Sequence, residues 1–162
     1  MESFKELARR RRSHRSFTDE CVSEEDVRTI LRAALMSPTA KGQRKWRFVV
    51  TDSKDRISRL SEIREAGSQF VAGAPAVIAV LGEPREQELW IEDGAIAAVS
   101  MQYQAEDLGL GSCWCHVRGR NSKEAGVSAE EKVREILGIP AECSVLCLIA
   151  VGHPADEREP QD

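Results

Sequence analysis

The stretch GAIAAVSM at residues 94–101 limits how this chain can fold more than any other feature. It lies within a predicted helix over residues 86–108 and leaves that helix almost no polar face. A helix that is apolar nearly all the way round has to be buried on both sides. In a chain of 162 residues, one way to bury the second side is against another subunit. The sequence therefore predicts a long central helix with a face available for self-association.

Hydrophobic periodicity predicts the elements that surround this helix. Further helices are expected over residues 2–11, from Ser23 to near Ser37, and over 54–66 and 128–137, with strands over 46–50, 74–82, 112–117 and 144–152. Ser23 and Ser128 are each followed by an acidic residue three positions later, a pattern typical of helix N-termini. This order predicts a single α+β domain over residues 1–162, with helices on a central sheet and a polar tail over about 154–162.

Composition excludes several classes of protein. No apolar run reaches the roughly 20 residues of a membrane span, so no membrane association is expected. The net charge of −4 argues against nucleic acid as the main partner. Five cysteines without an export signal favour reduced thiols in a cytoplasmic protein. Cys113 and Cys115 are too close together for a zinc site, and on a strand they share one face as buried packing thiols.

Positive charge is concentrated in RRRRSHRSF, residues 9–17, where five of nine positions are arginine. Arginine offers a planar, permanently charged fork that matches phosphate oxygens, and a serine hydroxyl adds a neutral donor. This mixture suits a compact dianion, such as a phosphate monoester, better than a long polyanion. A solvated helix face is the alternative that this stretch alone leaves open.

Two further segments have the character of ligand contacts. SPTAKGQRKW, residues 37–46, combines small residues at a helix end with several cations, and small residues let a backbone approach a flat ligand. An ordinary helix-to-strand connection is the alternative. LGLGSCWCHV, residues 108–117, has two close glycines before a strand but lacks the third glycine and the helix of a dinucleotide-binding fingerprint. The sequence contains no hydrolase elbow, Walker loop or metalloprotease motif.

In this order, RRSHRSF, SPTAKGQRKW and GLGSCW resemble three signatures of the flavin-dependent nitroreductase family. ILGIP at 136–140 and VGHP at 151–154 resemble its closing helix and last strand, with His153 in place of a usual tyrosine. The resemblance implies a nitroreductase-like three-layer sandwich, in which helices flank a central, mostly antiparallel sheet. It also implies a homodimer formed through long central helices, with FMN bound at the dimer interface.

The resemblance further implies which residues hold FMN. Its phosphate and ribityl chain are assigned to the basic segment, with one cation of the tail joining the phosphate. These residues are Arg11, Arg12, Ser13, Arg15 and Arg158. Arg15 is also expected near the pyrimidine edge, where a cation stabilises the reduced, anionic ring.

The ring itself is assigned to the other two segments. Pro38, Thr39 and Gly42 are expected to line it from the other subunit, and the main-chain N–H groups of about His116 and Val117 to meet N5 and O4. Gly42 stands where the family has an asparagine, and Arg44 where it has a glutamine. Arg44 is expected to replace the lost contact or to hold an anionic substrate.

The implied activity is hydride transfer from NAD(P)H, through flavin N5, to an oxidised acceptor such as a nitroaromatic or a quinone, in a ping-pong cycle. The flavin carries the chemistry, so only His116 is nominated as a catalytic residue, as a local proton donor. Two alternatives stay open at this point. One is a flavin-binding sensor or carrier with little turnover, and the other is a thiol redox or metal protein that uses Cys113 and Cys115.

Overall fold

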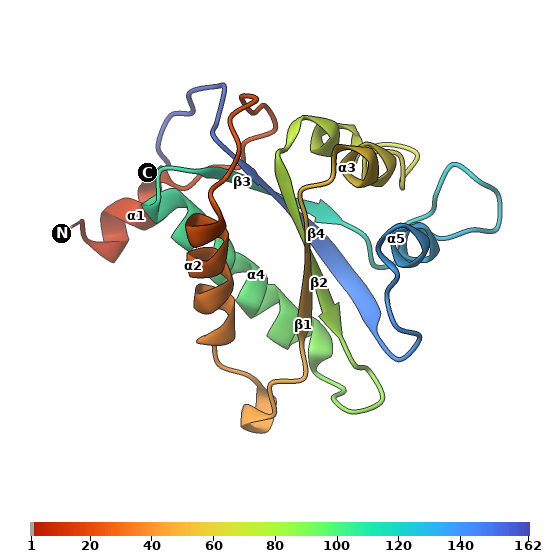
Figure 1. The fold of residues 1–162 in the computed structure, drawn as a ribbon. Helices are drawn as coiled ribbons and strands as arrows, with labels where there is room; N and C mark the ends of the chain where they lie inside the picture. The colour runs from red at the N-terminus through yellow and green to blue at the C-terminus, as the bar shows by residue number, and fades with distance from the viewer. Residues whose placement is uncertain (1) are drawn as a thin grey trace.

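The computed structural model describes residues 2–162 and follows the predicted order of elements (Figure 1). The helices are α1 (Phe4–Arg10), α2 (Glu24–Leu35), α3 (Lys54–Leu60), α4 (Trp90–Asp107) and α5 (Ala129–Leu137), with short 3₁₀ turns η1 (Ala40–Gly42) and η2 (Gln69–Gly73). The strands are β1 (Arg47–Thr51), β2 (Ala76–Gly82), β3 (Gly111–His116) and β4 (Ser144–Gly152).

The four strands form one sheet in the order β1-β2-β4-β3, and each neighbouring pair is antiparallel. Every residue of β2 is buried, and so is nearly all of β4. Continuous apolar runs such as AVIAVLG are typical of strands that are covered on both faces. β1 and β3 are the edge strands, so their outer main-chain groups are not used by the sheet.

Helices cover both faces of the sheet and make three layers. Figure 1 shows α2 and α4 on one face and α3 and α5 on the other. Two separate hydrophobic cores fill the spaces between the layers: one contains Ile57, Val133 and Leu148, and the other contains Ile30, Met101 and Ile149. The predicted three-layer α+β architecture is therefore confirmed.

The helix predicted over residues 2–11 loses three residues, and two other predicted helices are shorter by five residues or more. The helix predicted over residues 54–66 ends at Leu60. There the hydroxyl of Ser61 donates to the carbonyl oxygen of Ser58 at 2.6 Å. The buried hydroxyl of Ser68 donates to the carbonyl oxygen of Ser61 at 2.7 Å. Serine side chains that bond the backbone in this way compete with helical hydrogen bonds. The helix predicted from residue 86 begins at Trp90, because residues 83–87 form a hydrogen-bonded turn.

One side of the central helix α4 is left uncovered by the described residues of a single chain. Gly94 faces the sheet, where an added Cβ would lie 2.7 Å from Leu146 Cδ2, so the glycine permits the close approach of helix and strand. On the opposite side, Leu89, Ile96 and Val99 are 45%, 40% and 38% exposed. Their spacing of seven and three residues puts them on one stripe of the helix. The chain thus leaves an apolar stripe of its longest helix uncovered.

Candidate functional site

The basic segment lies against the free edge of β3. After α1 ends, Ser13 forms a parallel bridge with Ser112, and the His14 N–H donates to the Ser112 carbonyl oxygen at 3.0 Å. The His14 side chain turns inward and is only 7% exposed. Successive side chains of an extended segment point to opposite sides, so Ser13 and Arg15 share the side away from His14. A buried histidine thus orients the serine and the arginine that the sequence assigns to a ligand.

The guanidinium groups of this segment differ in their partners. Arg10 forms ion pairs with Glu2 at 2.6 Å and with Glu106 at 3.3 Å. Arg11 instead lies over the Tyr103 ring, 6.0 Å from its centroid, and Arg12 donates to the main-chain oxygen of Glu159. Within residues 2–162, no carboxylate lies within 4.0 Å of the Arg11, Arg12 or Arg15 guanidinium. These three cations are available to an anion, whereas Arg10 is already neutralised.

The polar tail packs along this segment. The Thr18 N–H donates to His153 O, the Ala155 N–H to Ser16 O, and the Gln161 N–H to Arg9 O, each at 2.9 Å. These three bonds follow the whole length of the basic segment. The tail expected from residue 154 is therefore a strap that holds the segment against β3.

His14 and Asp156 form a hydrogen bond between the basic segment and the middle of this strap. Neither residue belongs to a motif that predicts a role for it. His14 Nδ1 and Asp156 Oδ1 lie 2.8 Å apart, and this hydrogen bond holds the pKa of the Asp156 carboxyl below its usual range. An added Cβ on Gly111 would touch the His14 side chain at 3.0 Å, so that glycine makes room for it. The two partners are 142 positions apart, a separation at which no local pattern signals a contact.

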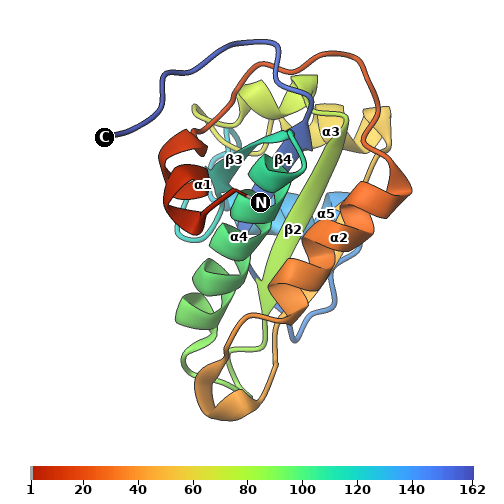
Figure 2. The ribbon, with the colours of Figure 1, turned by 90° about the vertical axis from the view of Figure 1, so that its left-hand side faces the viewer.

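The segment that contains Pro38, Thr39, Gly42 and Arg44 lies at the other end of α4. The Ala40 N–H donates to Asp93 Oδ1 at 2.9 Å, near the first turn of α4. Figure 2 shows this orange loop at one end of α4 and α1 near the other. A helix rises about 1.5 Å per residue, so Asp93 and Glu106 lie about 20 Å apart along the axis. One chain therefore does not bring the two predicted halves of the site together.

The 37–46 loop has an unusual backbone. Lys41, Gly42 and Arg44 have positive φ angles of 53°, 62° and 55°, a region that costs a non-glycine residue free energy. Arg44 is held there because its N–H donates to Thr39 Oγ1 at 3.1 Å and its guanidinium stacks 5.4 Å from the Trp46 ring centroid. The loop therefore presents a fixed guanidinium, with an open space beside Gly42.

His116 ends β3, with its ring stacked on Trp114 at 6.1 Å and an interplanar angle of 14°. Trp114 Nε1 donates to His116 Nδ1 at 3.2 Å, which places the proton of the neutral imidazole on Nε2. Partial burial, together with the charges of Arg120, Arg118 and Arg64, lowers the pKa of His116. At neutral pH this side chain is a neutral donor through Nε2.

The main-chain groups at this strand end differ from each other. The Val117 N–H donates to Leu146 O at 3.3 Å and is used within the sheet. In an antiparallel pair, the residues bonded to the neighbouring strand alternate with residues whose N–H points away. His116, one position earlier, therefore presents its N–H to the free edge of β3. Of the two N–H groups that the sequence proposes for a flavin, that of Val117 is used by the sheet, and that of His116 has no partner within residues 2–162.

The thiols are placed for packing. All five cysteines are free, and only Cys21 is exposed. Burial raises the pKa of Cys115 to about 11 and that of Cys113 above its usual value, so both are thiols at neutral pH. Among the described residues, no three His, Cys, Asp or Glu side chains are grouped to hold a metal ion. Nor is any helix within residues 2–162 long and apolar enough to cross a membrane.

Comparison with known proteins identifies the family. The family model described as "Nitroreductase family" matches residues 8–66 and 60–153. This chain belongs to the nitroreductase family.

Individual relatives match over nearly the whole chain. An FMN-dependent nitroreductase from Clostridium difficile R20291 is 38% identical with a TM-score of 0.94, covering 98% of this chain and 91% of its own. A structure from Desulfovibrio desulfuricans, solved in complex with FMN, is 29% identical with a TM-score of 0.78, covering 96% and 88%. An NADH dehydrogenase from Thermus thermophilus is 30% identical over 96% of this chain and 89% of its own length. The resemblance inferred from the sequence motifs is confirmed.

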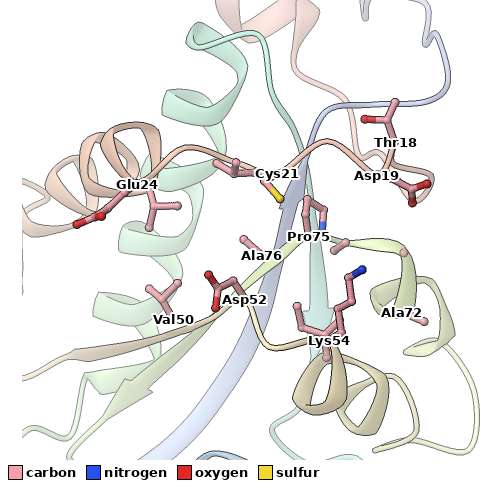
Figure 3. A pocket seen from close by; sticks show the side chains of 15 residues that line it. Thr18, Asp19, Cys21, Glu24, Val50, Asp52, Lys54, Ala72, Pro75 and Ala76 are labelled. Carbon is pink, nitrogen blue, oxygen red and sulfur yellow. The ribbon is translucent and has the colours of Figure 1, made fainter.

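In this nitroreductase-family chain, a hollow of about 610 Å³ lies away from the predicted site. Figure 3 shows Cys21, Asp52 and Lys54 around it, near the end of β1 and the start of α3. β1 and β3 are the two edges of the sheet, three strand spacings or about 14 Å apart. None of the predicted site residues lines this hollow. The candidate site is instead the surface along β3, which is open in a single chain.

The neutral state of His116 is directly measurable. We expect its imidazole to titrate below the usual value of about 6.5, because partial burial and three nearby guanidinium charges oppose protonation. The measurement is an NMR titration of the imidazole signals. Trp114→Phe removes the donor to Nδ1 and should raise the midpoint. A midpoint above 6.5 in the unsubstituted protein would contradict this account.

Proposed function

We propose that this protein is an FMN-dependent oxidoreductase that transfers hydride from NAD(P)H to an oxidised acceptor such as a nitroaromatic or a quinone. One observation carries the proposal: three arginines without carboxylate partners lie along the free edge of β3 in a nitroreductase-family chain. The relatives support this assignment, because one is named FMN-dependent, one is solved with FMN, and one is named an NADH dehydrogenase.

The residues present fit the phosphate end of FMN. Arg11, Ser13 and Arg15 supply charged and neutral donors from one extended segment, whose position is fixed by His14 and the tail. The Arg12 guanidinium already donates to the tail, so its contribution is shared between the strap and the phosphate. Arg158 is exposed in the same strap and is the tail cation that we assign to the phosphate. A preorganised set of donors binds an anion without a large ordering cost.

We propose that a second copy of the chain completes the site. The basic segment contacts one end of α4, and the loop with Thr39, Gly42 and Arg44 lies at the other end, about 20 Å away along the helix. We therefore assign this loop to the cofactor of another chain. The exposed stripe of Leu89, Ile96 and Val99 on α4 supplies an apolar contact for a two-fold dimer. This arrangement accounts for both the uncovered stripe and the divided site.

When bound, FMN supplies ping-pong hydride transfer between NAD(P)H and the acceptor. The chain's own residues bind and orient it. Arg15 would place a permanent positive charge beside the ring, where it would stabilise negative charge. The His116 main-chain N–H faces the same strand edge, and its imidazole holds a proton at Nε2. The protein supplies position and electrostatics, and we propose no other acid or base.

Free thiols are typical of a reducing compartment, which supports a cytoplasmic location. One continuous sheet with a core on each face supports a single domain over residues 1–162. Both statements are part of the proposal.

The colour of the purified protein tests the proposed activity. We expect a yellow protein whose absorbance near 450 nm is lost on addition of NADH or NADPH without oxygen and returns with a quinone. A yellow protein that neither nucleotide bleaches would indicate a flavin-binding sensor or carrier. A colourless protein that binds no added FMN would reject the proposal.

A further inference from the structure

The far end of β3 opens into a second, smaller hollow. It has a volume of about 270 Å³ and is lined by Arg64, Glu65, Ala66, Gly119, Arg120 and Asn121. Residues 64–66 follow α3, and residues 119–121 follow β3, so two separate parts of the chain meet here. Neither part belongs to the motifs that suggest the flavin site.

Arg64 is held at this hollow by the backbone. Its Nη1 donates to the His116 carbonyl oxygen at 3.4 Å. Its guanidinium lies over Gly67, within 3.2 Å of the point that a Cβ would occupy. Arg64 therefore contributes a positioned cation rather than a freely moving one.

Arg118 and Arg120 add two further cations beside the same histidine. Their charges, with that of Arg64, act on the His116 ring. The Gly119 N–H between them has no hydrogen-bond partner among the described residues. Arg64, Arg120 and the free Gly119 N–H thus lie together at one end of β3, and the charge of Arg118 acts on the same histidine ring.

The carboxylates of this region do not neutralise the three arginines. Glu62 pairs with Lys123, and Glu135 pairs with Arg59. Glu65 lies at the rim of the hollow, but within residues 2–162 no carboxylate oxygen comes within 4.0 Å of the Arg64, Arg118 or Arg120 guanidinium. In a chain with more acidic than basic residues, this is a local excess of positive charge.

We propose that Arg64, Arg118 and Arg120 form a subsite for an oxyanion, a phosphate or carboxylate carried by the electron donor or the acceptor. Guanidinium groups match both anions through paired N–H donors. The inference rests on the proposed function, because it places the subsite beside His116 at the ring end of the flavin site. The cofactor's own phosphate is assigned to the other end of β3, because Ser112 and His116 lie about 13 Å apart along the strand.

The test compares substrates that differ only in the anion. In Arg118→Gln/Arg120→Gln, both replaced residues are exposed, so folding should be retained. We expect the kcat/KM for one anionic substrate, NADPH or 4-nitrobenzoate, to fall at least about tenfold. The kcat/KM for the matching substrate that lacks this anionic group, NADH or nitrobenzene, should change less than about twofold. The donor pair and the acceptor pair show which substrate carries the anion. Lys54→Gln/Arg56→Gln, which removes two exposed cations from α3, should change neither pair.

A binding measurement makes the test independent of turnover. The anion of the affected substrate, adenosine 2′-phosphate for NADPH or benzoate for 4-nitrobenzoate, should shift the NMR amide signals of Gly119 and Asn121, whereas adenosine should not. The double variant should lose this shift. Equal effects on the two members of each substrate pair, or no shift with either anion, would overturn the subsite while the flavin remained functional. Loss of FMN from the double variant would also overturn it, by assigning these arginines to the cofactor. A protein that holds no FMN at all would instead reject the proposed function.

Discussion

Replacing both Arg11 and Arg15 with alanine is expected to yield a folded protein that no longer retains FMN. Both guanidinium groups lie on the segment held along β3, and neither has a carboxylate partner to lose. A hydrogen bond to a charged group contributes about 1.5–3 kcal/mol, so losing two such contacts should weaken FMN binding by roughly 10²- to 10⁴-fold. Quenching of FMN fluorescence during titration of the apo-protein measures this change, and circular dichroism reports the fold.

The matched control is Arg9→Ala/Arg56→Ala, which removes the same charge from exposed positions. Arg9 already pairs with Glu6 at 3.1 Å, and Arg56 lies on α3, on the opposite face of the sheet from α4. We expect this variant to bind FMN within a factor of about two of the unsubstituted protein. Unchanged FMN affinity in Arg11→Ala/Arg15→Ala would show that the basic segment does not hold the phosphate.

The second large effect is expected at the exposed stripe of α4. Ile96→Glu/Val99→Glu places two carboxylates at the centre of the proposed dimer contact. An uncompensated buried charge costs several kcal/mol, so the dimer should dissociate at least about 1,000-fold more readily. FMN should be lost as well, because the loop with Thr39 and Arg44 would no longer reach the cofactor of the other chain. Analytical ultracentrifugation measures the mass, and absorbance at 450 nm measures the bound flavin.

Ser58→Glu/Ala125→Glu is the control for added negative charge, because both positions are exposed and lie outside α4. It should remain dimeric and yellow. A stripe variant that stayed dimeric with FMN bound would place the contact elsewhere. A folded monomer that kept FMN at full affinity would contradict the divided site.

Much of the fold could be predicted because its signals are local. The apolar strands AVIAVLG and SVLCLIAVG are contiguous in sequence and lie at the centre of the sheet. Ser128 and Glu131 form the complete capping box that their spacing predicts, whereas at Ser23 only the serine hydroxyl caps the helix. Asp26, the acidic residue after Ser23, has a shorter side chain than the glutamate of a capping box.

The candidate site was only partly predictable. The three motifs identify segments by residue type, but they carry no information about which side of a strand an N–H faces. Val117 donates to Leu146 within the sheet, while the N–H of His116 is free, and strand pairing decides that difference. Arg64 joins Arg120 because the turn after α3 packs beside the end of β3.

The order of elements, the buried strands, the apolar helix and the basic segment can all be predicted from the amino-acid sequence, because each depends on residues close together in the chain. Two contacts become visible only in the folded chain: His14 anchors the tail through Asp156, and the basic segment and the 37–46 loop lie at opposite ends of α4. These contacts depend on how distant segments pack against one sheet. No local pattern encodes that arrangement.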